Sequence, residues 1–225
     1  MISGRGYVYA SFLFLLVSTF VLSHGVRSAA NDYAALPASA ADVDPARTGE
    51  RAPAFTVRSV ADEPYRFEPD ALERPAVLIT FRGGWCPYCN LHLSELRDVI
   101  PEIRAMGLDV LFLSGDRPEQ LYAGLQADTQ ADIAERDYLI LSDADMQAAL
   151  ALGIAFRIDK GLTDYLERKQ RDYAGSSIGR HNALAVPAVY VVDANGEIVF
   201  DYVNADYKVR LPADELLSAA RRAGP

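Results

Sequence analysis

Residues 77–89 carry the sequence VLITFRGGWCPYC, and this stretch decides the fold. Its first five residues, Val77 to Phe81, form an apolar run that predicts a buried strand. The segment from Leu91 to Met106 predicts a helix. Cys86 therefore lies at the start of a helix, where free backbone N–H groups and the helix dipole stabilise a thiolate. Since a thiolate is the nucleophile of disulfide and peroxide chemistry, the stretch predicts redox thiol chemistry.

Cys86 and Cys89 are the only cysteines of the chain. A CxxC pair cannot fill a tetrahedral zinc site by itself, and the histidines form no cluster with metal-ligand spacing. We therefore expect neither a metal nor another cofactor. A structural disulfide at this spacing would close a very short loop and constrain the unfolded chain little, which favours a catalytic pair.

Residues 1–30 have the pattern of a secretory signal peptide. Arg5 gives a positive start, Tyr7 to Ser23 is an uncharged apolar run, and Ser28-Ala29-Ala30 offers a cleavage site after Ala30. The alternative is an uncleaved membrane anchor, although the run is slightly shorter than the ~18 residues of a spanning helix. We expect an exported, periplasmic protein that has no membrane contact once the signal is cleaved.

Residues 31–48 are rich in Ala, Asp and Pro and predict a flexible linker, which leaves residues 49–225 as the folded domain. The formal net charge is −9. Because the chain is acidic and has no basic cluster, we expect neither nucleic acid nor an anionic membrane surface as a partner.

Strands and helices alternate after residue 77. Strands are expected at 77–81, 108–114 and 138–141, with helices at 89–106, 118–130 and 145–152; short strands are expected earlier, at 54–57 and 65–67. This order predicts a sheet with a parallel portion and right-handed crossovers. Asn195-Gly196 between two β-rich runs, 189–192 and 198–203, predicts a hairpin. A last helix is expected at 212–222, and residues 156–184 are expected to form an insertion over the core.

Four stretches together resemble a known family. Gly49-Glu50-Arg51-Ala52-Pro53-Ala54-Phe55 resembles its Gly-x-x-Ala-Pro-x-Phe opening, and 81–90 resembles its Arg-Gly-x-Trp-Cys-Pro-x-Cys variant. Residues 141–153 and 186–203 resemble its third strand with the following helix and its Pro-strand-turn-strand finish. The family is the peroxiredoxin-like AhpC/TSA group of the thioredoxin-like superfamily. The resemblance implies an α/β, thioredoxin-like three-layer fold with a central mixed β-sheet and helices on both faces.

The resemblance also implies roles for individual residues. Cys86 would be the attacking cysteine and Cys89 the resolving one, while Pro187 would be a cis proline that faces the disulfide. The implied substrate is a peroxide or a disulfide, and a thioredoxin-like protein would supply the electrons.

Two positions depart from the family pattern. Peroxiredoxins carry Pro-x-x-x-Thr-x-x-Cys, but Ile79 and Gly83 occupy the Pro and Thr positions here. The threonine hydroxyl that would orient a peroxide is therefore missing, and Trp-Cys-x-x-Cys is a pattern of disulfide oxidoreductases. The sequence leaves open a peroxidase, a periplasmic oxidoreductase of protein disulfides, and a non-catalytic thioredoxin-fold binding module.

Arg82 and Trp85 each have two interpretations. Arg82 is the nearest cation to Cys86 and could lower its pKa or bind a peroxide oxygen, but it could equally be a surface charge paired with an acid. Trp85 could shield the disulfide or simply fill the core.

Four further polar or aromatic residues are expected to have structural roles. Tyr88 is expected to be an exposed spacer and Asp143 a helix cap. His92 is expected at the edge of the core, with proton exchange with the cysteines as the alternative. His181 could approach the site across the fold, but the sequence gives it no partner there.

Overall fold

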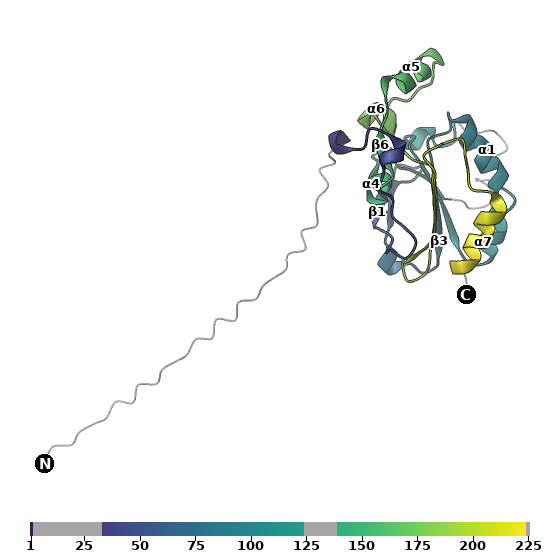
Figure 1. Cartoon of the computed structure of the whole chain (residues 1–225). Coiled ribbons are helices and arrows are strands. Elements are labelled where there is room, and N and C mark those ends of the chain that lie inside the picture. Colours follow the sequence, from purple (N-terminus) through teal and green to yellow (C-terminus); the bar gives the residue numbers. More distant parts are fainter. Residues whose placement is uncertain (2–32, 124–138, 224–225) are drawn as a thin grey trace. The chain divides into compact units, whose positions relative to one another are not determined.

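The centre of the domain is a mixed β-sheet (Figure 1). The computed structural model describes Met1 and residues 33–123 and 139–223. Within these residues the sheet has seven strands in the order β2-β1-β5-β4-β3-β8-β9. Their bounds are β1 Phe55–Arg58, β2 Pro64–Phe67, β3 Ala76–Phe81, β4 Asp109–Ser114, β5 Leu139–Ser142, β8 Ala188–Val192 and β9 Ile198–Val203. β3, β4 and β5 are parallel, β8 pairs antiparallel with β3, and β9 pairs antiparallel with β8, which confirms the predicted parallel portion and hairpin.

β3 lies in the middle of the sheet, and all six of its residues are buried. Val77, Ile79 and Phe81 pack into one hydrophobic cluster, and Ala76 and Leu78 into another. Because alternate side chains of a strand point to opposite faces, the two clusters are the two faces of the sheet. The first is covered by α1 (Pro87–Leu96), α2 (Ile100–Ala105) and α7 (Ala213–Ala223), and the second by α4 (Gln147–Ala151) (Figure 1). The predicted layers are confirmed.

The helix expected at 89–106 is two helices, α1 and α2. Pro101 lies in the first turn of α2, where its missing N–H has no cost, but inside a continuous helix its ring would clash with the carbonyl of Arg97. The chain therefore turns between Arg97 and Val99. The helix expected at 118–130 begins as the 3₁₀ turn η4 (Pro118–Gln120), and its continuation at 124–130 lies outside the described residues.

The segment expected to be a flexible linker lies against the domain over residues 33–48. It contains the 3₁₀ turns η1 (Tyr33–Ala35) and η2 (Ala40–Asp42). Ala46 N–H donates to Leu152 O at 3.0 Å, and Tyr33 O–H donates to Asp145 O at 2.8 Å. The apolar side chains of the segment pack on the cluster beneath α4, which composition alone does not reveal. The signal peptide predicted for residues 1–30 lies outside the described residues except for Met1.

The insertion contains a two-stranded sheet and two helices. β6 (Ala155–Arg157) pairs antiparallel with β7 (Ala183–Ala185), and α5 (Lys160–Arg168) and α6 (Ser177–His181) lie between them in the sequence. Outside the insertion, a short 3₁₀ turn, η3 (Pro69–Ala71), precedes β3. No helix among the described residues has the length and apolar character needed to cross a membrane.

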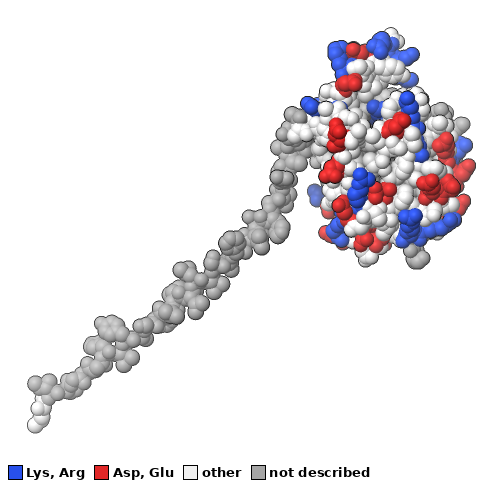
Figure 2. Space-filling view, in the orientation of Figure 1, with Lys and Arg blue, Asp and Glu red and all other residues white. Residues whose placement is uncertain are grey.

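Acidic and basic side chains are interspersed over the visible face of the domain (Figure 2).

Candidate active site

Cys86 is the residue that caps the N-terminus of α1, and Pro87 occupies the first turn. Its backbone oxygen accepts hydrogen bonds from the N–H groups of Cys89 at 3.1 Å and Asn90 at 3.2 Å. Cys86 and Cys89 are both free thiols and each is 1% exposed. The strand-to-helix junction predicted from the sequence therefore holds two buried thiols on one turn of helix.

The two thiols have opposite pKa shifts. A hydrogen bond from the Cys89 thiol lowers the pKa of Cys86 to about 6, and the charges of Arg82 and Arg210 act in the same direction, against burial. Burial raises the pKa of Cys89 well above its usual value, and the neighbouring Cys86 raises it further. At neutral pH the negative charge therefore resides on Cys86.

Arg82 is only 9% exposed and lies close to the thiols. Its guanidinium carbon lies 4.4 Å from the ring centroid of Tyr207 and 5.6 Å from that of Trp85. After burial itself, the described groups with the largest effect on its pKa are Cys86, Cys89, Tyr207 and Arg210, none of which is a carboxylate. A surface ion pair, one of the two sequence-based interpretations, is not the environment of Arg82.

Arg210 and Tyr207 reach the site from the segment 204–211, which follows β9. Arg210 Nη2 donates to Cys89 Sγ at 3.3 Å, and the Tyr207 ring meets Tyr88 edge-on at 5.6 Å between centroids. From the sequence alone, no residue of this segment was expected to contribute to the site. No local signal marks Arg210, because 121 positions separate it from Cys89.

Gly83 occupies a position that admits no larger residue. Its φ is +141°, and a Cβ atom there would lie 2.5 Å from Trp85 Nε1 and 2.6 Å from Asp116 Oδ1. The threonine of the peroxiredoxin pattern is thus excluded by the local packing.

Asp116 is a third residue that sequence reasoning missed, after Arg210 and Tyr207. Its Oδ2 accepts a hydrogen bond from Gly84 N–H at 2.7 Å, and burial raises its pKa to about 6. Asn90 Nδ2 donates to Gly84 O at 2.7 Å. Together Asp116 and Asn90 fix the loop that leads from β3 to Cys86.

Pro187 departs from the expectation carried by the resemblance, because its peptide bond with Val186 is trans rather than cis. Both flanking peptides are fixed: Val186 N–H donates to Ile154 O at 2.9 Å, and Ala188 N–H donates to Thr80 Oγ1 at 2.8 Å. Pro187 lines a small hollow with His92 and Arg210, so it lies on the Arg210 side of the site.

His92 is buried in a structural contact. Its Nε2 lies 3.1 Å from Leu211 O, and burial lowers the pKa of the ring to about 4. The ring is therefore neutral and donates its N–H to Leu211, which anchors the end of the 204–211 segment.

The other candidates also lie where structural roles were expected. Asp143 accepts hydrogen bonds from Ala148 and Ala149 N–H, both at 2.9 Å, and so caps α4. Tyr88 is exposed. His181 stacks on Tyr33 at 3.9 Å between ring centroids, away from the residues that surround the cysteines. Within the described residues, no three His, Cys, Asp or Glu side chains are grouped as metal ligands would be.

The chain is similar to known thiol oxidoreductases. A model of the AhpC/TSA family matches residues 48–201. The thiol-disulfide oxidoreductase ResA of Bacillus thuringiensis (strain Al Hakam) is 22% identical over 171 residues, covering 76% of this chain and 78% of the relative. The peroxiredoxin Bcp of Escherichia coli (strain K12) is 28% identical over 115 residues, covering 50% of this chain and 67% of the relative.

Two solved structures share the fold. Reduced Prx3 from Vibrio vulnificus in complex with H₂O₂ has a TM-score of 0.58 and 17% identity, covering 78% of this chain and 99% of that one. Peroxidoxin BcpB from Mycobacterium tuberculosis has a TM-score of 0.54 and 18% identity, covering 80% of this chain and 99% of that one. These likenesses confirm the thioredoxin-like α/β fold.

Proposed function

The chain belongs to the AhpC/TSA family, and we propose that it is a thiol-dependent peroxidase in which Cys86 attacks the peroxide and Cys89 resolves the product. The observation that carries this proposal is a buried thiol whose pKa is lowered by the Cys89 thiol and by the charges of Arg82 and Arg210. A small peroxide needs less room to approach such a sulfur than a disulfide on a folded protein does.

The first step is the reduction of the peroxide by two electrons. The Cys86 thiolate attacks the terminal oxygen of R–O–OH, the O–O bond breaks, and the leaving alkoxide takes up a proton to give ROH. The sulfur is oxidised by two electrons to a sulfenic acid, Cys86–SOH.

The second step closes the disulfide. Cys89 loses its proton and attacks the Cys86 sulfur, the S–O bond breaks, and the departing hydroxide with the released proton gives water. Because burial holds the pKa of Cys89 high, the charge of Arg210 beside its sulfur favours the thiolate needed here. A thioredoxin-like dithiol then returns both cysteines to the reduced state and is itself oxidised.

Three further residues have supporting roles in this proposal. Arg82 favours the Cys86 thiolate and offers N–H donors to the oxygens of the peroxide. Trp85 shields the pair from water, and Pro187 packs on the Arg210 side of the site.

The second candidate is a thiol-disulfide oxidoreductase, as the relative ResA is named. The lack of space for a threonine at Gly83 favours it. In that case the 204–211 segment must move to expose Cys86. A non-catalytic binding module is the least suited to the site, because a buried thiol with a pKa of about 6 has no function in a passive scaffold.

The test compares two oxidants on the fully reduced full chain, with the fluorescence of its single tryptophan, Trp85, as the signal. We expect H₂O₂ to oxidise the pair much faster than it oxidises dithiothreitol, with Cys86→Ser inactive and Cys89→Ser stopping at the sulfenic acid. Oxidation by H₂O₂ at the free-thiol rate, together with fast reaction with a protein disulfide, would establish the second candidate instead.

The cellular location is part of the proposal. Residues 1–30 support export to the periplasm with cleavage after Ala30, so that the electron donor would also be an exported thioredoxin-like protein. N-terminal sequencing of the protein from a periplasmic fraction tests this; a chain that retains Met1 in the membrane fraction would favour the anchor.

A further inference from the structure

A groove of about 340 Å³ lies next to Arg82. It is bordered by residues 38–40 of the N-terminal segment, by the end of β6, and by the first turn of α5. Its volume is within the range of roughly 300–1,000 Å³ that small-molecule sites occupy. The insertion and the N-terminal segment thus add a ligand-sized hollow to the site.

Among the residues that line this groove, Arg82 has a hydrogen-bond donor without an acceptor. Its Nε is buried and has no hydrogen-bond partner among the described residues, and no carboxylate is among the groups that most affect its charge. The Cys86 thiolate is the anion nearest in effect to Arg82, but it leaves the Nε–H donor without an acceptor. A buried donor without an acceptor is costly, so the Arg82 N–H groups favour a further ligand that offers acceptor oxygens. The planar fork of a guanidinium binds a carboxylate with two parallel hydrogen bonds.

The rest of the lining suits an acid with an organic body. Arg157 adds a second cation, and Phe156, Ile158 and Leu162 add apolar surface. The one acid in the lining, Asp159, accepts a hydrogen bond from Leu162 N–H at 3.1 Å as the N-cap of α5, so its charge faces the positive end of that helix.

We propose that this groove binds a carboxylate of the substrate, so that Cys86 reacts preferentially with compact organic hydroperoxides that bear a carboxylate group. Arg82 both lines the groove and lowers the pKa of Cys86. In this proposal, a substrate whose carboxylate lies against Arg82 extends its O–O bond toward the thiolate that Arg82 stabilises. The inference rests on the proposed peroxidase function, and it assigns that function a substrate class.

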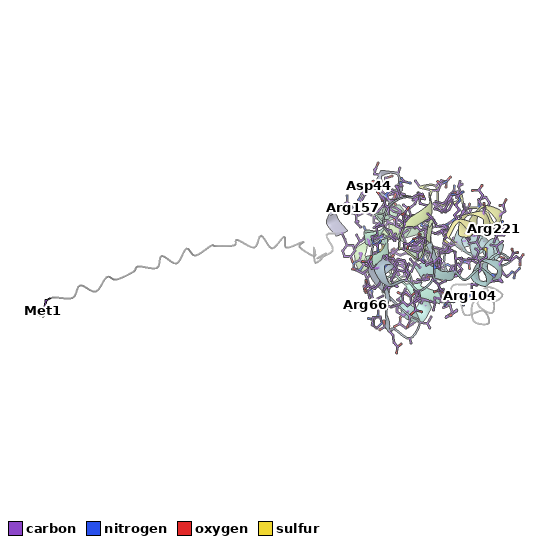
Figure 3. The ribbon with its side chains drawn as sticks, turned by 90° about the horizontal axis from the view of Figure 1, so that it is seen from below. Met1, Asp44, Arg66, Arg104, Arg157 and Arg221 are labelled. Carbon is purple, nitrogen blue, oxygen red and sulfur yellow. The ribbon has the colours of Figure 1, made fainter. Side chains whose placement is uncertain are left out.

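The first experiment measures binding without chemistry. Full-length protein with Cys86→Ser is titrated with 4-isopropylbenzoate and with the neutral 4-isopropylbenzamide, by calorimetry and by Trp85 fluorescence. We expect saturable binding of the benzoate alone, weakened about tenfold by Arg82→Gln or Arg157→Gln. Arg66→Gln is the matched control, since it removes the same charge from β2, elsewhere on the surface (Figure 3).

The second experiment measures selectivity. Cumene hydroperoxide and its para-carboxylate are compared as oxidants of the full chain, and each rate is divided by the rate with dithiothreitol. We expect the carboxylate to be favoured about tenfold, and Arg157→Gln to lower this ratio. Because both oxidants meet the same thiolate, a change in the pKa of Cys86 cancels from the ratio.

Equal binding of benzoate and benzamide, or a ratio of one in the unmodified chain, would overturn the carboxylate site. Failure of the peroxidase function gives a different result, namely H₂O₂ oxidation at the free-thiol rate. The binding experiment is independent of that result because Cys86→Ser carries out no chemistry.

Discussion

The difference between Cys86 and Cys89 arises at the scale of single hydrogen bonds. Both thiols are buried, and burial alone would raise the pKa of each. The Cys89 thiol donates toward Cys86, so one sulfur is stabilised as an anion and the other is kept neutral. Arg82 and Arg210 then favour the anion from two different elements. In the proposed mechanism, the direction of attack follows from which thiol donates.

The first prediction concerns this charge. The rate at which iodoacetamide alkylates Cys86 should rise through about pH 6 and level off above it, because the thiolate is the reacting form. Replacing Arg210 with Gln removes a cation that favours the thiolate, so the midpoint should move up by roughly one unit. Arg66→Gln is the control, and an unchanged midpoint in Arg210→Gln would contradict the role of this charge.

The second prediction concerns Gly83. Gly83→Ala should lower the free energy of unfolding by about 2 kcal/mol or more, because it combines an unfavourable φ with contacts under 3 Å to Trp85 and Asp116. Gly49→Ala is the matched control: its φ is +89°, but a Cβ would meet nothing within 4 Å, so about 1 kcal/mol is expected. Denaturant unfolding measures both, and equal losses would show that packing at Gly83 is not tight.

At the scale of elements, the sequence predicts those helices, strands and turns that are determined by residues adjacent along the chain. The run 77–81 and the CxxC locate β3 and the start of α1, and Asn195-Gly196 locates the β8–β9 hairpin. Pro101 also predicts the break between α1 and α2, because proline disrupts the interior of a helix. The role of the 204–211 segment could not be predicted from the sequence, since it depends on where β9 ends in the folded domain.

The third prediction concerns that segment. Tyr207 packs on Arg82 and Tyr88, so Tyr207→Ala should loosen the cover over the cysteines at a cost of about 1 kcal/mol in stability. Reaction with the bulky reagent 5,5′-dithiobis(2-nitrobenzoate) should accelerate more than reaction with H₂O₂, because a small oxidant needs less room to approach the sulfur. Equal changes for the two reagents would mean that the segment does not limit access. Tyr165→Ala, an exposed tyrosine on α5, is the control.

At the scale of the whole molecule, the site is assembled from parts that the fold brings together. β8 is antiparallel to β3 and β9 is antiparallel to β8, so β9 runs in the same direction as β3 and ends at the same edge of the sheet. The segment that follows β9 therefore brings Arg210 to Cys89 in the first turn of α1. Asp116 arrives from the end of β4, the parallel neighbour of β3. The sequence suggests Cys86, Cys89, Arg82 and Trp85 as candidate site residues because they share one short stretch. It could not identify Asp116, Tyr207 or Arg210, because their proximity depends on strand order.

The N-terminal segment gives the last prediction, because its composition and its packing lead to different expectations. A flexible linker could be altered without effect on the domain, but Tyr33 stacks on His181 and donates its hydroxyl to Asp145 O. Tyr33→Ala should therefore lower the free energy of unfolding by about 1–3 kcal/mol, as the loss of a packed aromatic side chain does. Thermal or denaturant unfolding of the full chain measures it, with Tyr165→Ala as the exposed-tyrosine control.

Residues 38–40 of the same segment border the groove beside Arg82, so the loss of Tyr33 packing should also weaken benzoate binding. An unchanged free energy of unfolding would support a flexible linker. It would also mean that residues 38–40 do not form a fixed wall of the proposed groove.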